Sequence, residues 1–462
     1  MRPRRTLVAV LATAALLAAG CSDRGDNSDS ESASGSTQQQ PAASADFGDL
    51  KNVCQAGQST SAPAQGVTAR EINVGVFSDV GFTKKQEFPD AAKVFTAWCN
   101  EAGGINGRKL VANIRDSKLL EVRQRMSEAC REDFALVGGG AAMDNMGVKD
   151  RLSCLLPDFT AQPVSLENGG SDLQVTPQPG GSSYVMYAGY YNWLLKEAYP
   201  GSAKAIGVIA GDSPTMKPLT AMADEGVKAV GGAITYSDLY PAAGVSDWTP
   251  YAQSIKSKGV KGLLFYGSYS QLAKLEQALT TADYKLDWID ANSNAYGDEF
   301  IQLAGEKALT GQNNVADLSG VYPLENAAQN PATQKVVDLF AKYAPGAKVG
   351  LGSIRAFSSW LLFAKSAAAC GDNLTRKCVY EAALKETAWT GGGLQAPLDL
   401  SQSDAPVKCF NVVVASPDGW KPADFKPDNG AYRCDAPAVK LTGDYPKPTT
   451  LADVGKSLDD VK

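Results

Sequence analysis

Short apolar runs typical of β-strands alternate along this chain with segments of helical spacing, and this alternation constrains the fold more than any other feature. The runs and helical segments of a first series are 71–77, 89–101, 109–114, 120–132, 134–137 and a strand start at 155–157. Those of a second series are 203–210, 217–230, 262–266 and 288–289. Strands that alternate with helices form parallel sheets joined by right-handed crossovers. The sequence therefore predicts two α/β lobes, with ligand-binding loops at the carboxyl ends of their strands.

The N-terminal residues have the pattern of an export signal. Three arginines precede an apolar stretch at 7–19, which is shorter than the roughly 20 apolar residues that a membrane-spanning helix needs. We therefore expect a cleaved signal peptide over 1–20 rather than an anchor helix. Small residues at 18–20 precede Cys21 and resemble the lipobox of bacterial lipoproteins, in which this cysteine is lipidated.

Residues 21–67 are rich in Ser, Asp, Gly, Gln and Ala. Such a segment buries too little apolar surface to offset the entropy of ordering it. The sequence therefore predicts a flexible tether that holds a folded body at the outer face of the bacterial cytoplasmic membrane.

Composition excludes several classes of function. The 462 residues include no histidine, so neither a Ser-His-Asp or Cys-His nucleophile nor an imidazole metal ligand can be built. The net charge of -6 argues against nucleic acid, whose phosphates need a basic surface. The chain also has no paired-carboxylate motif of the kind that acid–base catalysis without histidine requires. We expect no enzymatic activity, metal, cofactor or nucleic-acid partner.

The cysteine count suggests a disulfide framework. Of nine cysteines, Cys21 is assigned to the lipid, and the remaining eight suit four disulfides in an oxidising compartment. Eight cysteines allow 105 pairings, so the count alone does not choose among them. Their places relative to the expected elements favour Cys370–Cys378, Cys409–Cys434, Cys130–Cys154 and, by elimination, Cys54–Cys99.

Several motifs together point to one family. Residues 100–110 (NEAGGINGRKL) end an expected helix and lead into an expected strand, and their glycines suit the positive φ of a helix C-cap and tight turn. Further motifs follow in order at 162–163 (QP), 247–249 (DWT), 266–269 (YGSY) and 371–375 (GDNLT). This series resembles the type I periplasmic solute-binding proteins, in the leucine/isoleucine/valine-binding branch that serves ABC importers.

The resemblance implies two Rossmann-like lobes with parallel sheets joined by a three-strand hinge, the type I periplasmic binding fold. Lobe 1 would take 68–182 and 312–405, lobe 2 would take 183–311 and 406–437, and 438–462 would form a C-terminal tail. Ligand would close the cleft by a hinge motion. The closed monomer would then be presented to a membrane permease and its ATPase, because this chain has no Walker motif of its own.

The resemblance also places the ligand in the loops between the lobes. Carried over by position, the ligand-binding candidates are Phe82, Gly140, Ala141, Ala142, Met143, Thr160, Ala161, Gln162, Ser268, Tyr269, Asn292 and Asn294. The sequence departs from the amino-acid-binding pattern, because 178–180 holds no acid and Asn292 stands at the second acidic position. A buried ammonium without a counter-charge is too costly to bind. Asp290 would supply the acid if the alignment moved by two residues.

We therefore expect a ligand with one polar or anionic end and an apolar or aromatic body, rather than a free α-amino acid. Thr160 and the backbone N–H groups around Ala141 and Ala161 are expected to hold the polar end. Met143 and Tyr269 are expected to line the apolar part of the pocket, together with the aromatic ring at 82.

Other interpretations stay open from the sequence. Phe82 and Met143 suit ordinary core packing, and Asn292 and Asn294 suit a turn. The chain could also bind branched-chain amino acids through an intact zwitterion site, or serve as a sensing lobe without transport. Genes for a permease and an ATPase beside this one would distinguish transport from sensing.

Overall fold

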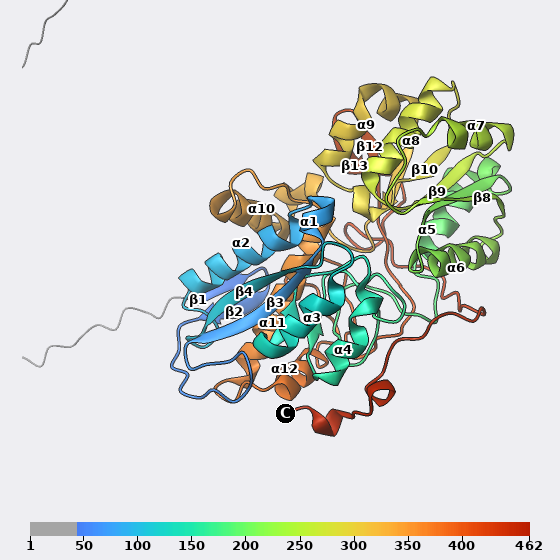
Figure 1. Ribbon diagram of the computed structural model, residues 1–462. Helices are drawn as coiled ribbons and strands as arrows, with labels where there is room; N and C mark the ends of the chain where they lie inside the picture. The colour runs from blue at the N-terminus through green and yellow to red at the C-terminus, as the bar shows by residue number, and fades with distance from the viewer. Residues whose placement is uncertain (1–43) are drawn as a thin grey trace, which may run out of the picture. The chain divides into compact units, whose positions relative to one another are not determined.

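The computed structural model describes residues 44–462, so the expected signal peptide, Cys21 and residues 22–43 of the expected tether lie outside the described part. Within that part, no helix is both long and apolar enough to cross a bilayer. The described chain forms two α/β lobes, each built around its own β-sheet (Figure 1).

Lobe 1 is built on a four-stranded parallel sheet in the order β4-β3-β5-β6. Its strands are β3 (Glu71–Ser78), β4 (Lys109–Asp116), β5 (Ala135–Val137) and β6 (Asp158–Phe159). One face, which carries Val74 and Val76, packs against α2 (Glu87–Glu101) and α11 (Leu351–Cys370). The other face, which carries Phe77, packs against α3 (Val122–Glu132). The remaining helices of this lobe are α1 (Val80–Thr83), α4 (Val148–Ser153), α10 (Pro331–Tyr343) and α12 (Arg376–Ala383).

Lobe 2 is built on a seven-stranded sheet in the order β13-β12-β11-β10-β9-β7-β8. The strands are β7 (Ile206–Asp212), β8 (Ile234–Pro241), β9 (Gly262–Tyr266), β10 (Trp288–Asp290), β11 (Asn314–Asp317), β12 (Val412–Ser416) and β13 (Gly419–Pro422). β7 to β11 are parallel to one another. At one edge of the sheet β12 pairs antiparallel with β11, and β13 pairs antiparallel with β12. α5 (Ala188–Trp193) and α6 (Met216–Ala229) pack on one face, and α7 (Thr249–Ser257), α8 (Tyr269–Thr281) and α9 (Asp298–Gly311) pack on the other.

The two-lobe α/β fold with parallel sheets confirms the fold class expected from the sequence. In both lobes the strand order reverses beside the first strand, so β3 and β5 in lobe 1 and β7 and β9 in lobe 2 flank a switch point. The loops that leave the carboxyl ends of these strands diverge there and open a crevice. This topology positions the candidate site described below.

Two strand assignments differ from the expectations. β8 was not expected, because its tyrosines and isoleucine alternate with exposed polar residues at the edge of the sheet and make no continuous apolar run. The second concerns the apolar run 407–415, whose spacing is typical of a strand but which forms one only from residue 412, as β12, so Cys409 lies before the strand. In that run, Asn411 uses its side chain to accept from Gly320 N–H and donate to Val321 O, which holds this stretch as a crossing segment.

Between β6 and β12 the chain crosses between the lobes three times, as the family resemblance implies. The crossings follow β6, β11 and the 390–400 region. One boundary differs from the expected 312, because β11 pairs with β10 and so belongs to the sheet of lobe 2. That crossing therefore comes after Asp317.

A β-hairpin occupies part of the segment that the sequence predicted to be a tether. β1 (Ser44–Phe47) and β2 (Leu50–Gln55) pair antiparallel and lie against lobe 1. Phe47 is fully buried and its ring centroid lies 5.2 Å from that of Phe357 on α11. The prediction of flexibility was therefore wrong for residues from 44 onward. The buried Phe47 ring and the disulfide at Cys54 hold this segment to lobe 1, and the average composition of the segment does not reveal either contact.

The glycine-rich loop after α2 receives this hairpin. Gly104 and Gly107 have φ of +81° and +87°, and a Cβ on Gly107 would lie 2.2 Å from the carbonyl oxygen of Gly57. Gln55 N–H donates to Gly104 O, and Gly107 N–H donates to Gln55 O. The loop therefore works as a docking site for the N-terminal hairpin, and its glycines permit the close backbone approach.

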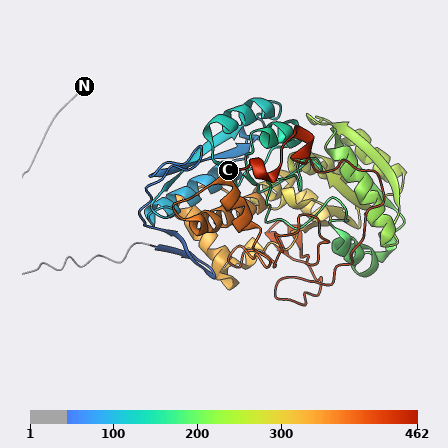
Figure 2. The ribbon, with the colours of Figure 1, turned by 90° about the horizontal axis from the view of Figure 1, so that it is seen from below.

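The C-terminal tail contacts both lobes rather than standing apart (Figure 2). On lobe 2, the Glu225 carboxylate accepts hydrogen bonds from the N–H groups of Thr442 and Gly443. On lobe 1, Leu451 is buried against α4, and its N–H donates to the Asp172 carboxylate. The tail is thus a further connection between the lobes.

The structure joins the eight cysteines as the four pairs that the sequence favoured: Cys54–Cys99, Cys130–Cys154, Cys370–Cys378 and Cys409–Cys434. In the chain-entropy model each loop closure contributes on the order of 3 kcal/mol. We expect the exported protein, denatured without reductant, to release no free thiol from these eight residues. Titration with a thiol reagent checks this, and two or more reactive cysteines per chain would contradict the pairing.

Candidate ligand-binding site

A cavity of about 690 Å³ lies between the lobes at the switch points of the two sheets. Lobe 1 lines it from the loops that follow β3, β5 and β6, and lobe 2 lines it from the loops that follow β7, β8, β9 and β10. The crossing residue Ser319 and the first turns of α11 complete the wall. This volume is in the range of pockets that bind drug-sized molecules, and a free amino acid would occupy only part of it.

Most of the residues expected from the sequence meet at this cavity. Those that line it are Phe82, Gly140, Ala141, Ala142, Met143, Gln162, Ser268, Tyr269, Asn292 and Asn294. Thr160 and Ala161 do not line it, because both side chains are turned into the interior of lobe 1.

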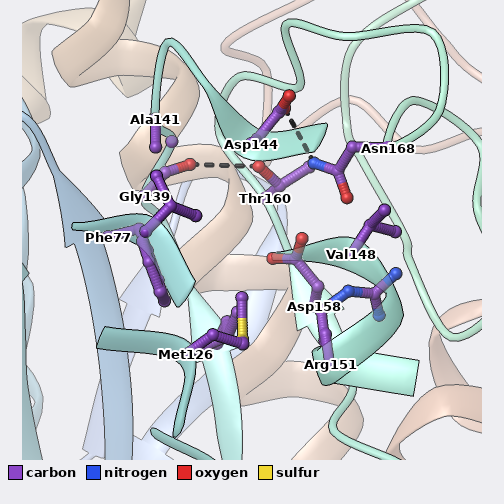
Figure 3. A pocket seen from close by; sticks show the side chains of 13 residues that line it. Phe77, Met126, Gly139, Ala141, Asp144, Val148, Arg151, Asp158, Thr160 and Asn168 are labelled. Atoms are coloured by element: carbon purple, nitrogen blue, oxygen red, sulfur yellow. Dashed lines mark hydrogen bonds between the residues drawn. The ribbon is translucent and has the colours of Figure 1, made fainter. Parts of the chain in front are cut away.

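Thr160 and Ala161 are not free to hold a ligand in this structure. The Thr160 hydroxyl donates to Gly139 O at 3.0 Å, and the Ala161 N–H donates to the same oxygen at 2.9 Å. Thr160 instead lines a small separate cavity of about 30 Å³, beside Asp144 and Asn168 (Figure 3). The expectation that these groups form a carboxylate clamp is therefore corrected, because their donors already make hydrogen bonds within the protein.

An internal carboxylate occupies another part of the expected clamp. Asp79, which follows β3, accepts hydrogen bonds from Ala142 N–H at 2.7 Å and Leu119 N–H at 2.8 Å. The Ser117 hydroxyl also donates to it. Asp79 thus already fills the position at which a ligand carboxylate would meet the Ala142 N–H, so a ligand anion needs a different anchor.

Three direct contacts join the lobes at one edge of the cavity. The Lys85 ammonium of lobe 1 lies 4.0 Å from the ring centroid of Tyr269 and donates to Asn294 O at 3.2 Å. Gln162 Nε2 donates to Asn294 Oδ1 at 3.0 Å. Burial lowers the pKa of Lys85 and the charge of Glu87 opposes this shift. Tyr269, expected over the ligand, therefore also stacks against a cation from the opposite lobe.

The choice between Asp290 and Asn292 as the residue at the cavity is decided by the structure. Asn292 lines the cavity, whereas Asp290 is buried behind it and accepts from the Tyr190 hydroxyl at 3.3 Å and from Asn292 N–H at 3.1 Å. Burial raises the pKa of Asp290 to about 7. The acid that could have held an ammonium group therefore does not face the cavity.

The rest of the cavity wall combines methionine and aliphatic side chains with aromatic rings. Its large apolar and aromatic members are Phe82, Phe88, Leu119, Met143, Val164, Leu166, Val185, Met186, Tyr187, Tyr191, Met216, Leu219, Met222, Tyr240, Tyr266, Tyr269 and Leu351. The four methionines come from both lobes, and of them the sequence analysis named only Met143 as a ligand contact. Methionine is flexible and polarisable, so it adapts to irregular or flexible apolar ligands.

Four charged side chains line the cavity, and three of them have a hydrogen-bond or ion-pair partner within the protein. Asp79 accepts the hydrogen bonds described above, and Lys85 and Glu87 lie 3.9 Å apart as an ion pair. Arg355 on α11 is 7% exposed, yet within the described residues its guanidinium makes no hydrogen bond or ion pair, and its buried Nε is left without an acceptor. Arg355 was not among the residues expected from the sequence, although it is the single arginine in the apolar run 351–364.

The sequence of this two-lobed chain matches a known protein family. The model of the periplasmic binding proteins matches residues 72–419, which is most of the described chain. The chain belongs to this family. As a periplasmic binding protein it is a solute-binding protein and not an enzyme.

Solved structures of other periplasmic binding proteins share this fold. A fatty acid ABC transporter substrate-binding protein from Thermomonospora curvata has a TM-score of 0.65 at 16% identity, with 80% of this chain and 97% of that chain covered. A leucine-binding protein from Thermotoga maritima has 0.63 at 13% identity, with 76% and 97% covered. A substrate-binding periplasmic protein from Ralstonia solanacearum has 0.63 at 18% identity, with 76% and 100% covered. No curated protein matches this chain in sequence.

Proposed function

We propose that this periplasmic binding protein captures a small organic solute for an ABC importer, and that the solute has one polar or anionic end and an apolar body. The observation that carries the proposal is the cavity of about 690 Å³ between the lobes, whose wall is mainly apolar and contains one unpaired cation. The membrane partners are a permease and an ATPase. Lipidation at Cys21 would hold the protein at the outer face of the cytoplasmic membrane.

Similar structures support a solute of this kind without identifying it. The Thermomonospora curvata protein is named for fatty acids, which have one anionic end and an apolar chain. The Thermotoga maritima protein is named for leucine, which is zwitterionic. The cavity of the present chain fits the first type of ligand better, because its charged groups include no unpaired acid for an ammonium group.

Branched-chain amino acid binding is the second candidate. It would need Glu87 to leave Lys85 and pair with the ligand ammonium, since Asp290 is turned away from the cavity. A ligand-sensing role without transport would use the same site, and it differs only in the partner protein that binds the closed form.

A thermal-shift screen followed by small-angle scattering tests the proposed function. Monocarboxylates with aliphatic or aromatic bodies are expected to raise the melting temperature, by an amount equivalent to about 2.7 kcal/mol at 100 times Kd, and leucine, isoleucine and valine are not. At saturation the radius of gyration is expected to fall as the hinge closes. Micromolar leucine binding would favour the second candidate, and turnover of any solute would contradict a binding function.

A further inference from the structure

Three buried polar groups on the wall of the cavity have no hydrogen-bond partner. They are Gln178 Nε2, Ser319 Oγ and Arg355 Nε. Gln178 and Ser319 belong to crossing segments between the lobes, and Arg355 lies in the second turn of α11. These segments approach one another, because Asp317 acts on Arg355 and the Gln395 side chain joins Ser358 of α11 to Pro177 O. A buried polar group without a partner costs about 1–3 kcal/mol, and more when it is charged. Three such groups on one wall indicate that their partner is a ligand.

Arg355 is the most informative member of this set. It is 7% exposed, and within residues 44–462 no carboxylate oxygen lies within the 4.0 Å of an ion pair. Burial lowers its pKa, whereas Tyr187, Asp317 and Glu87 act in the opposite direction. Since arginine cannot discharge itself at neutral pH, an anion in the cavity is the remaining way to compensate its charge.

We propose that Arg355, Ser319 and Gln178 form the head-group site for a monocarboxylate whose flexible aliphatic chain lies along the methionine-lined wall. This inference rests on the proposed function and adds to it the anchoring residues and the class of solute. It also moves the anionic end from the loops after β5 and β6 to the hinge. The guanidinium supplies paired donors of the geometry that a carboxylate accepts.

The surrounding charges favour a single negative charge on the ligand. Asp317 is buried near Arg355, and its own pKa is raised by burial to about 6. Glu87 is the other acid that acts on Arg355. A phosphate or dicarboxylate would bring a second charge into a region that has one unpaired cation and two nearby acids, so a monocarboxylate fits this site better.

The methionines of the wall favour a flexible aliphatic chain on the ligand. Met186, Met216 and Met222 line the cavity from the lobe 2 side, and Met143 lines it from the lobe 1 side. Methionine has three rotatable side-chain bonds and packs against a flexible chain in many conformations. Affinity is therefore expected to rise with chain length, by roughly fourfold for each further CH₂ that is buried.

Calorimetry on the delipidated chain tests the proposal with decanoate, methyl decanoate, hexanoate, phenylacetate and leucine as probes. We expect decanoate to bind most tightly. The Arg355→Met variant should weaken decanoate at least ~100-fold and methyl decanoate less than ~3-fold, since only decanoate carries the charge. Ser319→Gly, which keeps the positive φ of +53° favourable, should weaken decanoate by roughly 5–10-fold. Lys365→Met, on the same helix but half-exposed and paired with Glu386, is the matched control and should change nothing.

A second readout separates binding from structure. Because Arg355→Met removes an unpaired buried charge, it should raise the melting temperature of the ligand-free protein by about 2–4 °C. A lower melting temperature with unchanged decanoate affinity would overturn the proposal. So would loss of decanoate binding in Lys85→Met but not in Arg355→Met. If no acyl carboxylate binds but another solute does, the head-group site is refuted while the proposed binding function stands.

Discussion

At pH 8, the Glu276→Gln variant is expected to be about 2–4 kcal/mol more stable than the wild type. Glu276 on α8 is fully buried in the core of lobe 2, where one carboxylate oxygen accepts from Asn314 and the other has no partner. Burial raises its pKa from 4.5 to about 8. The folded state therefore keeps a proton that the unfolded chain has already released, and each pKa unit of difference corresponds to about 1.4 kcal/mol.

The direction of the Glu276 pKa shift determines the pH range over which the stabilities of the variant and the wild type differ. A raised carboxyl pKa stabilises the folded state fully below about pH 4.5, and that contribution is lost as pH rises towards 8. The gap between variant and wild type should therefore be small at pH 5 and widen up to pH 8. Urea unfolding at several pH values measures it, with exposed Glu306→Gln on α9 as the control. A gap that does not depend on pH would show that Glu276 is not protonated in the folded protein.

Replacing Arg108 by alanine is expected to destabilise the protein by about 3–5 kcal/mol. Arg108 is 1% exposed and donates to the carbonyl oxygens of Thr68 at 2.9 Å and Gly371 at 3.0 Å. It also donates to Ser61 O and to the Asp372 carboxylate, at 3.2 and 2.9 Å. The variant would remove a buried guanidinium that donates to four partly buried acceptors at once, and it would leave a cavity where the arginine side chain had packed.

The matched control for this prediction is Arg123→Ala. Arg123 pairs with Asp150, but its side chain is 71% exposed, so its loss should cost less than about 1 kcal/mol. Chemical denaturation with both variants measures the difference. Equal stability of Arg108→Ala and wild type would mean that residues 59–61 and the loop at 371–372 are held to lobe 1 by other contacts.

Much of the fold was predictable because its signals are local. Apolar runs marked β3, β4, β7 and β9, and helical spacing marked α2, α3 and α6. The hairpin at 44–55 was missed because its stability comes from two distant partners, Phe357 and Cys99. Average composition does not reveal such contacts.

The position of the site was predictable from the sequence, but the polar groups that remain free to bind a ligand there were not. Parallel strands meet at one edge of a sheet, so the loops after β3 and β5 had to meet in lobe 1 and those after β7 and β9 in lobe 2. The family resemblance placed these two edges opposite each other. Which donors remain free in that crevice depends on partners from elsewhere in the chain. Asp79 accepts from Ala142 N–H and Gly139 O accepts from the Thr160 hydroxyl, which removes the expected clamp.

The sequence by itself determined the two α/β lobes, the glycine-rich turn that joins α2 to β4, and the absence of any histidine-based chemistry. Strand periodicity, glycine conformation and composition are properties of neighbouring residues or of the whole chain, so they can be read without coordinates. The tertiary structure alone decided that Asn292 and not Asp290 lines the cavity, and that Arg355 lies at its wall without a partner. Burial and hydrogen bonding arise between residues that are often far apart in the sequence, such as Tyr190 and Asp290, and these contacts set which polar groups a ligand can use.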